Sequence, residues 1–168
     1  MTIPANKNEL IKQFELVGYV VFRLNNSEDL IDSINYDVEK LLDSGDFRTN
    51  SKIYSYNNSP RIVEAWKYSE SIRNLVFHPQ ILSVMQSLFD QEPLPFSTIN
   101  FVRSTEQPFH SDAVHFPTQP ANQLAAAWVA LEDIDLRSGP LQVIPGSHMT
   151  PEFVYSQIDK PLAKSLSD

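Results

Sequence analysis

His110 and Asp112 are the residues whose types and spacing most directly suggest chemistry, because they form a His-x-Asp pair. On an extended segment, side chains two residues apart point to the same side of the backbone. An imidazole and a carboxylate on one side supply two of the three ligands in the two-histidine, one-carboxylate site that holds non-haem Fe(II) and leaves coordination positions open. The pair therefore predicts a metal site that still needs a second histidine.

Few histidines are available as that third ligand, since the others are His78, His115 and His148. His115 falls on the opposite face from His110 if the segment stays extended, so only a bend at residues 113–114 would bring it round. It otherwise fits a loop histidine or a pocket wall that touches substrate. His148 follows a Pro-Gly turn, where we expect it to satisfy backbone groups. His78 precedes a proline and indicates a helix end.

Composition sets the broad class of the protein. The chain has 168 residues, of which 42% are hydrophobic and 20% charged, as expected for one globular domain with a core of its own. Its net charge of −8, without a basic run, argues against nucleic acid or an anionic membrane as a partner. There is no cysteine, which excludes disulfides and zinc–thiolate sites and fits a reducing compartment. No leader-like start or membrane-length apolar run is visible, so we predict a cytoplasmic location.

The first part of the chain, about residues 1–92, is predicted to be helical. Gly18 sits where the first helix would stop, acidic residues after Ser27 suit the start of the second, and Pro79 separates the third from the fourth. The polar residues 46–60 predict a loop. The apolar stripes at helical spacing lie at residues 10–17, 30–42, 69–77 and 81–90.

The second part, about residues 93–168, is predicted to form strands. Helices followed by strands in one domain of residues 1–168 indicate an α+β fold, with helices packed on one face of an antiparallel sheet. A jelly-roll barrel is one way to close such strands, and it carries metal sites at its mouth. The predicted strands are residues 96–103, 124–131 and 141–144, with a shorter β-rich run at 19–23.

Three motifs stand in a fixed order: His110-Ser-Asp112, then Ala-Trp-Val-Ala-Leu-Glu-Asp at residues 127–133, then Ser-Gly-Pro-Leu-Gln-Val-Ile-Pro-Gly-Ser-His at residues 138–148. In this order and spacing the chain resembles the phytanoyl-CoA dioxygenase family. Residues 14–21 and 78–82 also look like the N-terminal helices of that family. The similarity runs over most of the chain and is most specific between the first and last of these motifs.

The resemblance implies a double-stranded β-helix, a cupin-like jelly roll, that uses Fe(II) and 2-oxoglutarate. Such enzymes activate O₂ and hydroxylate an unactivated C–H bond of a small-molecule substrate while 2-oxoglutarate becomes succinate. His110 and Asp112 would be the first two metal ligands, leaving positions for 2-oxoglutarate and O₂. Trp128 would lie near the co-substrate pocket, although it also fits a plain core residue. Arg103 could bind an anion or be an exposed charge at a strand end.

The chain departs from the family after His148. The family's second histidine, and an arginine that pairs with 2-oxoglutarate, would both fall past Asp168, and residues 149–168 contain neither type. We expect a piece of a longer enzyme, with a β part that is incomplete at its C-terminus and whose exposed edges allow self-association. The alternatives are a short relative without catalysis, or a site completed by His115, His148 or a second chain.

Two other functions stay open on the sequence alone. One is a catalytically inactive ligand-binding or interaction module on a degenerate dioxygenase scaffold. The other is a zinc hydrolase that uses His110, Asp112 and His115, for which no general base is identifiable. The aromatic residues Tyr56, Phe109 and Phe116 could line an apolar substrate pocket or simply pack.

Overall fold

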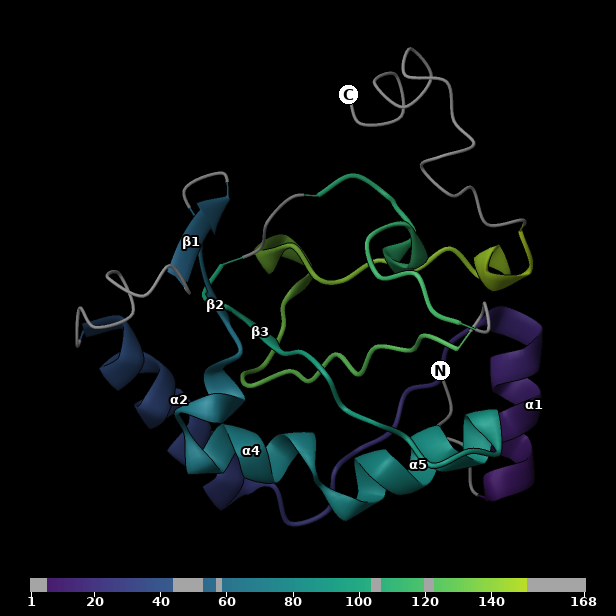
Figure 1. Cartoon of the computed structure of the whole chain (residues 1–168), viewed down its shortest axis with the longest axis horizontal. Coiled ribbons are helices and arrows are strands. Elements are labelled where there is room, and N and C mark those ends of the chain that lie inside the picture. The colour runs from purple at the N-terminus through teal and green to yellow at the C-terminus, as the bar shows by residue number, and fades with distance from the viewer. Residues whose placement is uncertain (1–5, 44–52, 57–58, 104–106, 120–122, 151–168) are drawn as a thin grey trace.

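A computed structural model describes residues 6–43, 53–56, 59–103, 107–119 and 123–150 of the chain. It has an α+β fold, as the sequence predicts, in which helices accompany a small antiparallel sheet. In Figure 1 the helices form an arc along one side of the molecule, and the sheet stands above α2 and α4. The later segments of the chain, green in Figure 1, run across the space between the sheet and α1.

The first two helices are α1, Lys7–Val17, and α2, Glu28–Asp43. The side chain of Asn6 caps α1 by accepting a hydrogen bond of 3.0 Å from the backbone N–H of Glu9. Gly18 ends α1 in the left-handed conformation, with φ of +83°, which confirms the predicted stop. Acidic residues occupy the first turn of α2, where they interact favourably with the helix dipole.

The next two helices confirm the break predicted at Pro79. They are α4, Glu70–Val76, and α5, Pro79–Phe89. His78 lies between the two helices and caps α5, because its Nδ1 accepts a hydrogen bond of 3.2 Å from Gln80 N. The helices α1 and α5 pack together, and the rings of Phe14 and Phe89 meet edge to face at 6.0 Å.

The sheet contains β1, Ile53–Tyr56, β2, Ser59–Val63, and β3, Ile99–Phe101, in the order β1-β2-β3. Both pairings are antiparallel. The loop predicted over residues 46–60 is therefore wrong where β1 and the start of β2 form. Aromatic and β-branched residues among the polar ones favour pairing here, and the pairing buries Ile62 completely.

Only one of the strands predicted from the sequence is present, and β3 is shorter than the predicted 96–103. Residues 19–23, 124–131 and 141–144 belong to no strand among the described residues, so these three predictions are wrong. Trp128 is 48% exposed rather than buried in a core strand. Alternation and apolar content predict where a strand can form, but a strand also needs a neighbour, and these segments pair with none in the described part of the chain.

The core lies between α2, α4 and β2. Its buried members are Ile34, Ile62, Ala65 and Ile72, each at most 3% exposed. Leu131 packs against this cluster, and the side chain of Asn35 on α2 donates a hydrogen bond of 3.0 Å to the carbonyl of Leu131. Leu131 therefore contacts the helical layer both through its apolar side chain and through its backbone carbonyl.

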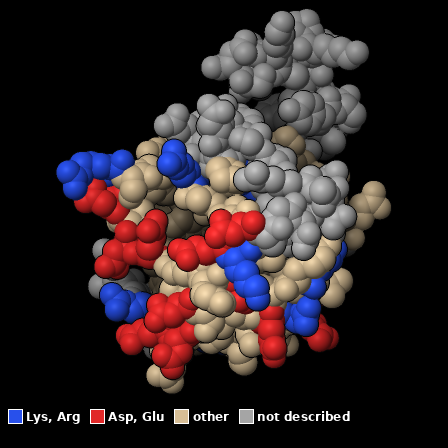
Figure 2. Space-filling model, turned by 90° about the vertical axis from the view of Figure 1, so that its left-hand side faces the viewer, with Lys and Arg blue, Asp and Glu red and all other residues tan. Residues whose placement is uncertain are grey.

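The surface carries charges of both signs. Figure 2 shows the side of the molecule where α2 lies, with acidic side chains gathered on it and basic ones between them. This face therefore presents no uniform basic surface. Within the described residues, no helix combines the length and the apolar character needed to cross a bilayer.

Candidate functional site

The side chains of His110 and Asp112 lie together. Nε2 of His110 is 3.3 Å from Oδ1 of Asp112, and the two side chains are 37% and 55% exposed. Nδ1 of His110 forms a hydrogen bond of 2.8 Å with the carbonyl of Pro108. A carbonyl can only accept, so Nδ1 carries the hydrogen and Nε2 is the nitrogen turned toward the carboxylate.

A short 3₁₀ helix, η2, Asp112–Val114, follows directly and shapes the site. The backbone N–H groups of His115 and Phe116 both donate to the carbonyl of Asp112 at 2.9 Å. This turn brings the ring of His115 to 6.0 Å from the ring of His110, at an angle of 68°. The segment is therefore not extended, and the bend needed to bring His115 to the side of His110 is present.

The proximity of His115 does not create a complete set of ligands. Among the residues whose positions are described, no three histidine, aspartate or glutamate side chains are grouped so that they could hold a metal ion. His148 lies elsewhere, with its Nε2 3.0 Å from the carbonyl of Glu15 on α1. It satisfies a backbone group, as the sequence suggests, but that group belongs to the first helix rather than to the Pro-Gly turn.

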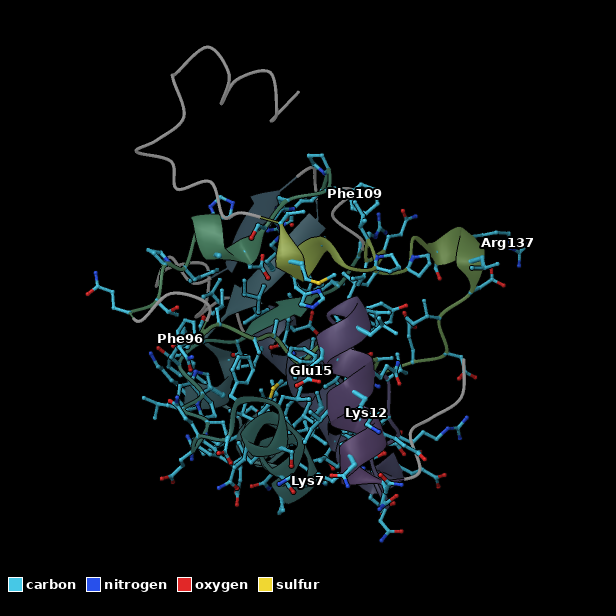
Figure 3. The ribbon with its side chains drawn as sticks, turned by 90° about the vertical axis from the view of Figure 1, so that its right-hand side faces the viewer. Lys7, Lys12, Glu15, Phe96, Phe109 and Arg137 are labelled. Carbon is cyan, nitrogen blue, oxygen red and sulfur yellow. The ribbon has the colours of Figure 1, made fainter. Side chains whose placement is uncertain are left out.

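An open pocket of about 400 Å³ has His115 in its wall, and the ring of His115 is the one that lies 6.0 Å from the ring of His110. The rings of Phe96 and Phe116 meet edge to face across 5.8 Å and give the pocket an aromatic character. Of the aromatic residues considered from the sequence, Phe116 lines this pocket, whereas Phe109 is 61% exposed and does not. Figure 3 shows Phe96 and Phe109 well apart. The remaining lining residues are Pro117 and Thr118.

The two residues expected near a co-substrate, Trp128 and Arg103, do not line this pocket. Trp128 is half-exposed on a segment outside the helices and strands, and Arg103 is exposed two residues beyond β3. The side chain of Tyr56 lies outside the described part of the chain.

Arg61 contacts the segment that leads to the site, a role that the sequence does not predict. It lies on β2 and is only 6% exposed. Its Nη2 donates a hydrogen bond of 3.4 Å to Gln107, three residues before His110, and its guanidinium lies 5.3 Å from the ring centre of Phe101. Pairing of Arg61 with Phe101 in the sheet register explains this stacking. No sequence pattern marks the position, since its burial follows from a pairing that no local signal predicts.

Glu64 fixes the segment that carries Phe96. Its backbone N–H donates to the carbonyl of Thr98 at 2.8 Å, and its carboxylate accepts from Thr98 N at 3.3 Å. Burial opposes ionisation of this carboxyl, but hydrogen bonds from Lys67, Ser97, Trp66 and Thr98 outweigh it and lower its pKa to about 2.

Comparisons with known proteins agree with the family resemblance. The family model described as Phytanoyl-CoA dioxygenase (PhyH) matches residues 14–162. The peroxisomal phytanoyl-CoA dioxygenase of Rattus norvegicus is 32% identical over 106 residues, which are 63% of this chain and 28% of that protein. The corresponding Bos taurus protein is 30% identical over 106 residues, with the same coverage of both chains. A probable phytanoyl-CoA dioxygenase of Caenorhabditis elegans is 29% identical over 102 residues, 58% of this chain and 31% of that protein.

The matched region thus spans less than a third of the length of each of these relatives. No solved structure matches the chain. The family model nevertheless covers nearly all of the chain, including the His-Asp pair, η2 and the Pro-Gly turn. The chain therefore belongs to the phytanoyl-CoA dioxygenase (PhyH) family.

Proposed function

We propose that this chain carries the first two metal ligands, His110 and Asp112, of a non-haem Fe(II)- and 2-oxoglutarate-dependent dioxygenase that hydroxylates a small molecule. The observation that carries the proposal is the approach of Nε2 and Oδ1 to 3.3 Å while Nδ1 donates to Pro108. Membership in a family whose named relatives are dioxygenases supports the reaction class.

The geometry of this pair fits a metal ion. With its hydrogen on Nδ1, His110 turns Nε2 toward a carboxylate oxygen of Asp112, so that one nitrogen and one oxygen are available to bind a cation beside them. Bonds of about 2.1 Å at right angles place two donor atoms about 3 Å apart, close to the observed separation. A hydrogen bond from the other ring nitrogen to a carbonyl is also the usual arrangement for a metal-bound histidine.

The chemistry that Fe(II) and 2-oxoglutarate supply in this family is O₂ activation, coupled to decarboxylation of 2-oxoglutarate to succinate and hydroxylation of a C–H bond. The residues of this chain contribute positioning. Pro108 fixes the imidazole orientation, and Arg61 holds Gln107 at the start of the same segment. The jelly-roll closure and contact of Trp128 or Arg103 with the co-substrate stay predictions.

The pocket beside the pair suits an apolar part of the substrate. Phe96, Phe116 and Pro117 contribute no charge, and His115 lies between this apolar wall and His110. Small-molecule binding also suits an acidic chain, for which we propose no nucleic-acid or membrane partner. A cytoplasmic location and self-association stay predictions. The exposed side chains of Val143 and Ile144, on a segment without strand partners among the described residues, would support association.

The alternative predicted from the sequence, a non-catalytic binding module, stays a prediction. No third metal ligand accompanies His110 and Asp112 among the described residues. On that alternative, the contact of 3.3 Å between the two side chains is structural and holds no metal.

Succinate production from 2-oxoglutarate in the presence of Fe(II) separates the two functions. In the intact protein, the dioxygenase proposal requires turnover that Asp112→Ala abolishes and that Asp133→Ala, at an exposed aspartate outside the site, leaves unchanged. Turnover that survives in Asp112→Ala would rule out the assignment of this carboxylate. Absence of turnover and of metal binding in the intact protein would favour the module.

A further inference from the structure

The Pro-Gly turn sits on the C-terminal end of α1. Its 3₁₀ helix, η4, Ser147–Met149, lies next to this end in both Figure 1 and Figure 3, where Glu15 is labelled on α1. The backbone N–H of Gly146 donates to the carbonyl of Val17 at 2.9 Å. Nε2 of His148 forms a hydrogen bond of 3.0 Å with the carbonyl of Glu15, 133 residues earlier in the chain. Since a carbonyl only accepts, His148 is the donor.

These two hydrogen bonds satisfy helix groups that would otherwise have no partner. The last four carbonyls of an α-helix lack donors within the helix. In α1 the carbonyl of Phe14 is satisfied by Gly18 N at 2.7 Å, while those of Glu15 and Val17 receive donors from the distant turn. The turn therefore acts as a cap supplied from the other end of the described chain.

The cap requires a residue without a side chain at position 18. A Cβ atom at Gly18 would lie 2.4 Å from Nδ1 and 2.8 Å from Cγ of His148, closer than any real contact of this kind. The ring of Phe14 lies on the same imidazole, with centroids 6.3 Å apart. Gly18 thus does two things, because it ends α1 in a left-handed conformation and leaves the space that the imidazole fills.

We infer that Gly18, Gly146 and His148 form a clasp that fixes the end of segment 131–148 to α1. The segment forms no strand pairs within the described residues, and its other end is held by the hydrogen bond from Asn35 to Leu131. The clasp commits Nε2 of His148 to a backbone carbonyl and assigns this histidine a structural role rather than a metal-binding one. The inference does not depend on the proposed enzymatic activity.

A comparison of two glycines tests the clasp. Gly18 and Gly146 have φ of +83° and +79°, so the backbone strain of alanine is similar at either position. At Gly146 an added Cβ would meet only Met149 Cε at an ordinary 3.5 Å. We expect Gly18→Ala to lower the midpoint of thermal unfolding of the full chain more than Gly146→Ala does.

The same comparison in a His148→Ala background isolates the contact between the two residues. Most of the extra loss caused by Gly18→Ala should disappear there, leaving only the approach to the Cβ of residue 148 at 3.1 Å. An equal loss from Gly18→Ala in both backgrounds would overturn the inference.

The rate of hydrogen exchange at the backbone amide of Gly146, measured by NMR, gives a second test that leaves both glycines unchanged. His148→Gln keeps a donor at the position of Nε2, whereas His148→Leu keeps apolar volume without a donor. A net hydrogen bond of about 1 kcal/mol corresponds to roughly fivefold faster exchange in His148→Leu, with the rate in His148→Gln near that of the unmodified chain. An unchanged rate in His148→Leu would contradict the clasp.

Discussion

The imidazole rings of His110 and His115 lie 6.0 Å apart because η2 reverses the chain between them. His115 is thereby shared between two environments. Its ring lies near that of His110, which we propose as a metal ligand, and it also lines the aromatic pocket. This position suits a residue that touches the substrate beside a metal, and it distinguishes a pocket-wall role from that of a third ligand.

Replacing His115 by alanine should therefore leave metal affinity nearly unchanged. If His115 is only a pocket-wall residue, its ring limits the size of the pocket and donates no electron pair to the metal. Titration with Mn(II), followed by electron paramagnetic resonance, measures this directly. A drop in affinity of about tenfold or more, equal to at least about 1.4 kcal/mol, would instead identify His115 as the missing ligand.

Asp37 should be important for stability, because it connects α2 to the start of α4. Its Oδ2 accepts hydrogen bonds from Ser69 and Ser71 at 2.6 and 2.7 Å, which hold the pKa of its carboxyl below the usual value. Since a hydrogen bond to a charged group contributes about 1.5–3 kcal/mol, we expect Asp37→Ala to lower the free energy of unfolding by about 2 kcal/mol.

Urea unfolding at neutral pH measures the effect of Asp37→Ala. Asp32→Ala is the matched control, because Asp32 is an exposed aspartate on the same helix. Similar losses of stability in the two variants would show that the hydrogen bonds from Ser69 and Ser71 to Asp37 do not stabilise the fold.

Glu64 should make stability dependent on acidic pH. Its pKa is about 2 in the folded chain against a reference value of 4.5, so the folded state favours the ionised form. A depressed folded pKa gives stabilisation that is complete above the unfolded value and is lost as pH falls from 4.5 towards 2. With Lys67 half-exposed, we expect this contribution to be about 2–3 kcal/mol at neutral pH.

Chemical unfolding of the unmodified chain and of Glu64→Gln across this pH range checks the contribution. The difference in unfolding free energy between the two proteins should be largest at neutral pH and should shrink in acid. A difference that stays constant with pH would show that ionisation of Glu64 does not stabilise the fold.

The helices could be predicted because their signals are local. Gly18, Ser69 and Pro79 mark helix ends through their own backbone preferences and hydrogen-bonding groups, and the structure places helix ends at all three. The pairing of β2 with β3 joins segments that are distant in the chain, which a single sequence does not specify. The pairing of Arg61 with Phe101, which joins residues on either side of two helices, illustrates this.

The candidate site could be predicted in part for the same reason. The spacing of His110 and Asp112 is a local property, and the two side chains do lie together. The turn at Asp112–Val114, which brings His115 round, is only one of two alternatives on the sequence alone, because extended and bent backbone fit the same residues. The support from Arg61 and the contact between His148 and α1 are tertiary, so neither could be read from the motifs.

Metal binding by His110 and Asp112 can be measured without knowledge of the substrate. Mn(II) titrations should show a site in the unmodified chain that Asp112→Ala and His110→Ala each weaken by at least roughly tenfold, since loss of even an indirect metal partner costs about 10–100-fold. Affinity should also fall as pH is lowered, because protons compete for Nε2. Asp133→Ala should bind like the unmodified chain. Equal Mn(II) affinity in the unmodified chain and in Asp112→Ala would contradict the assignment of this pair as metal ligands.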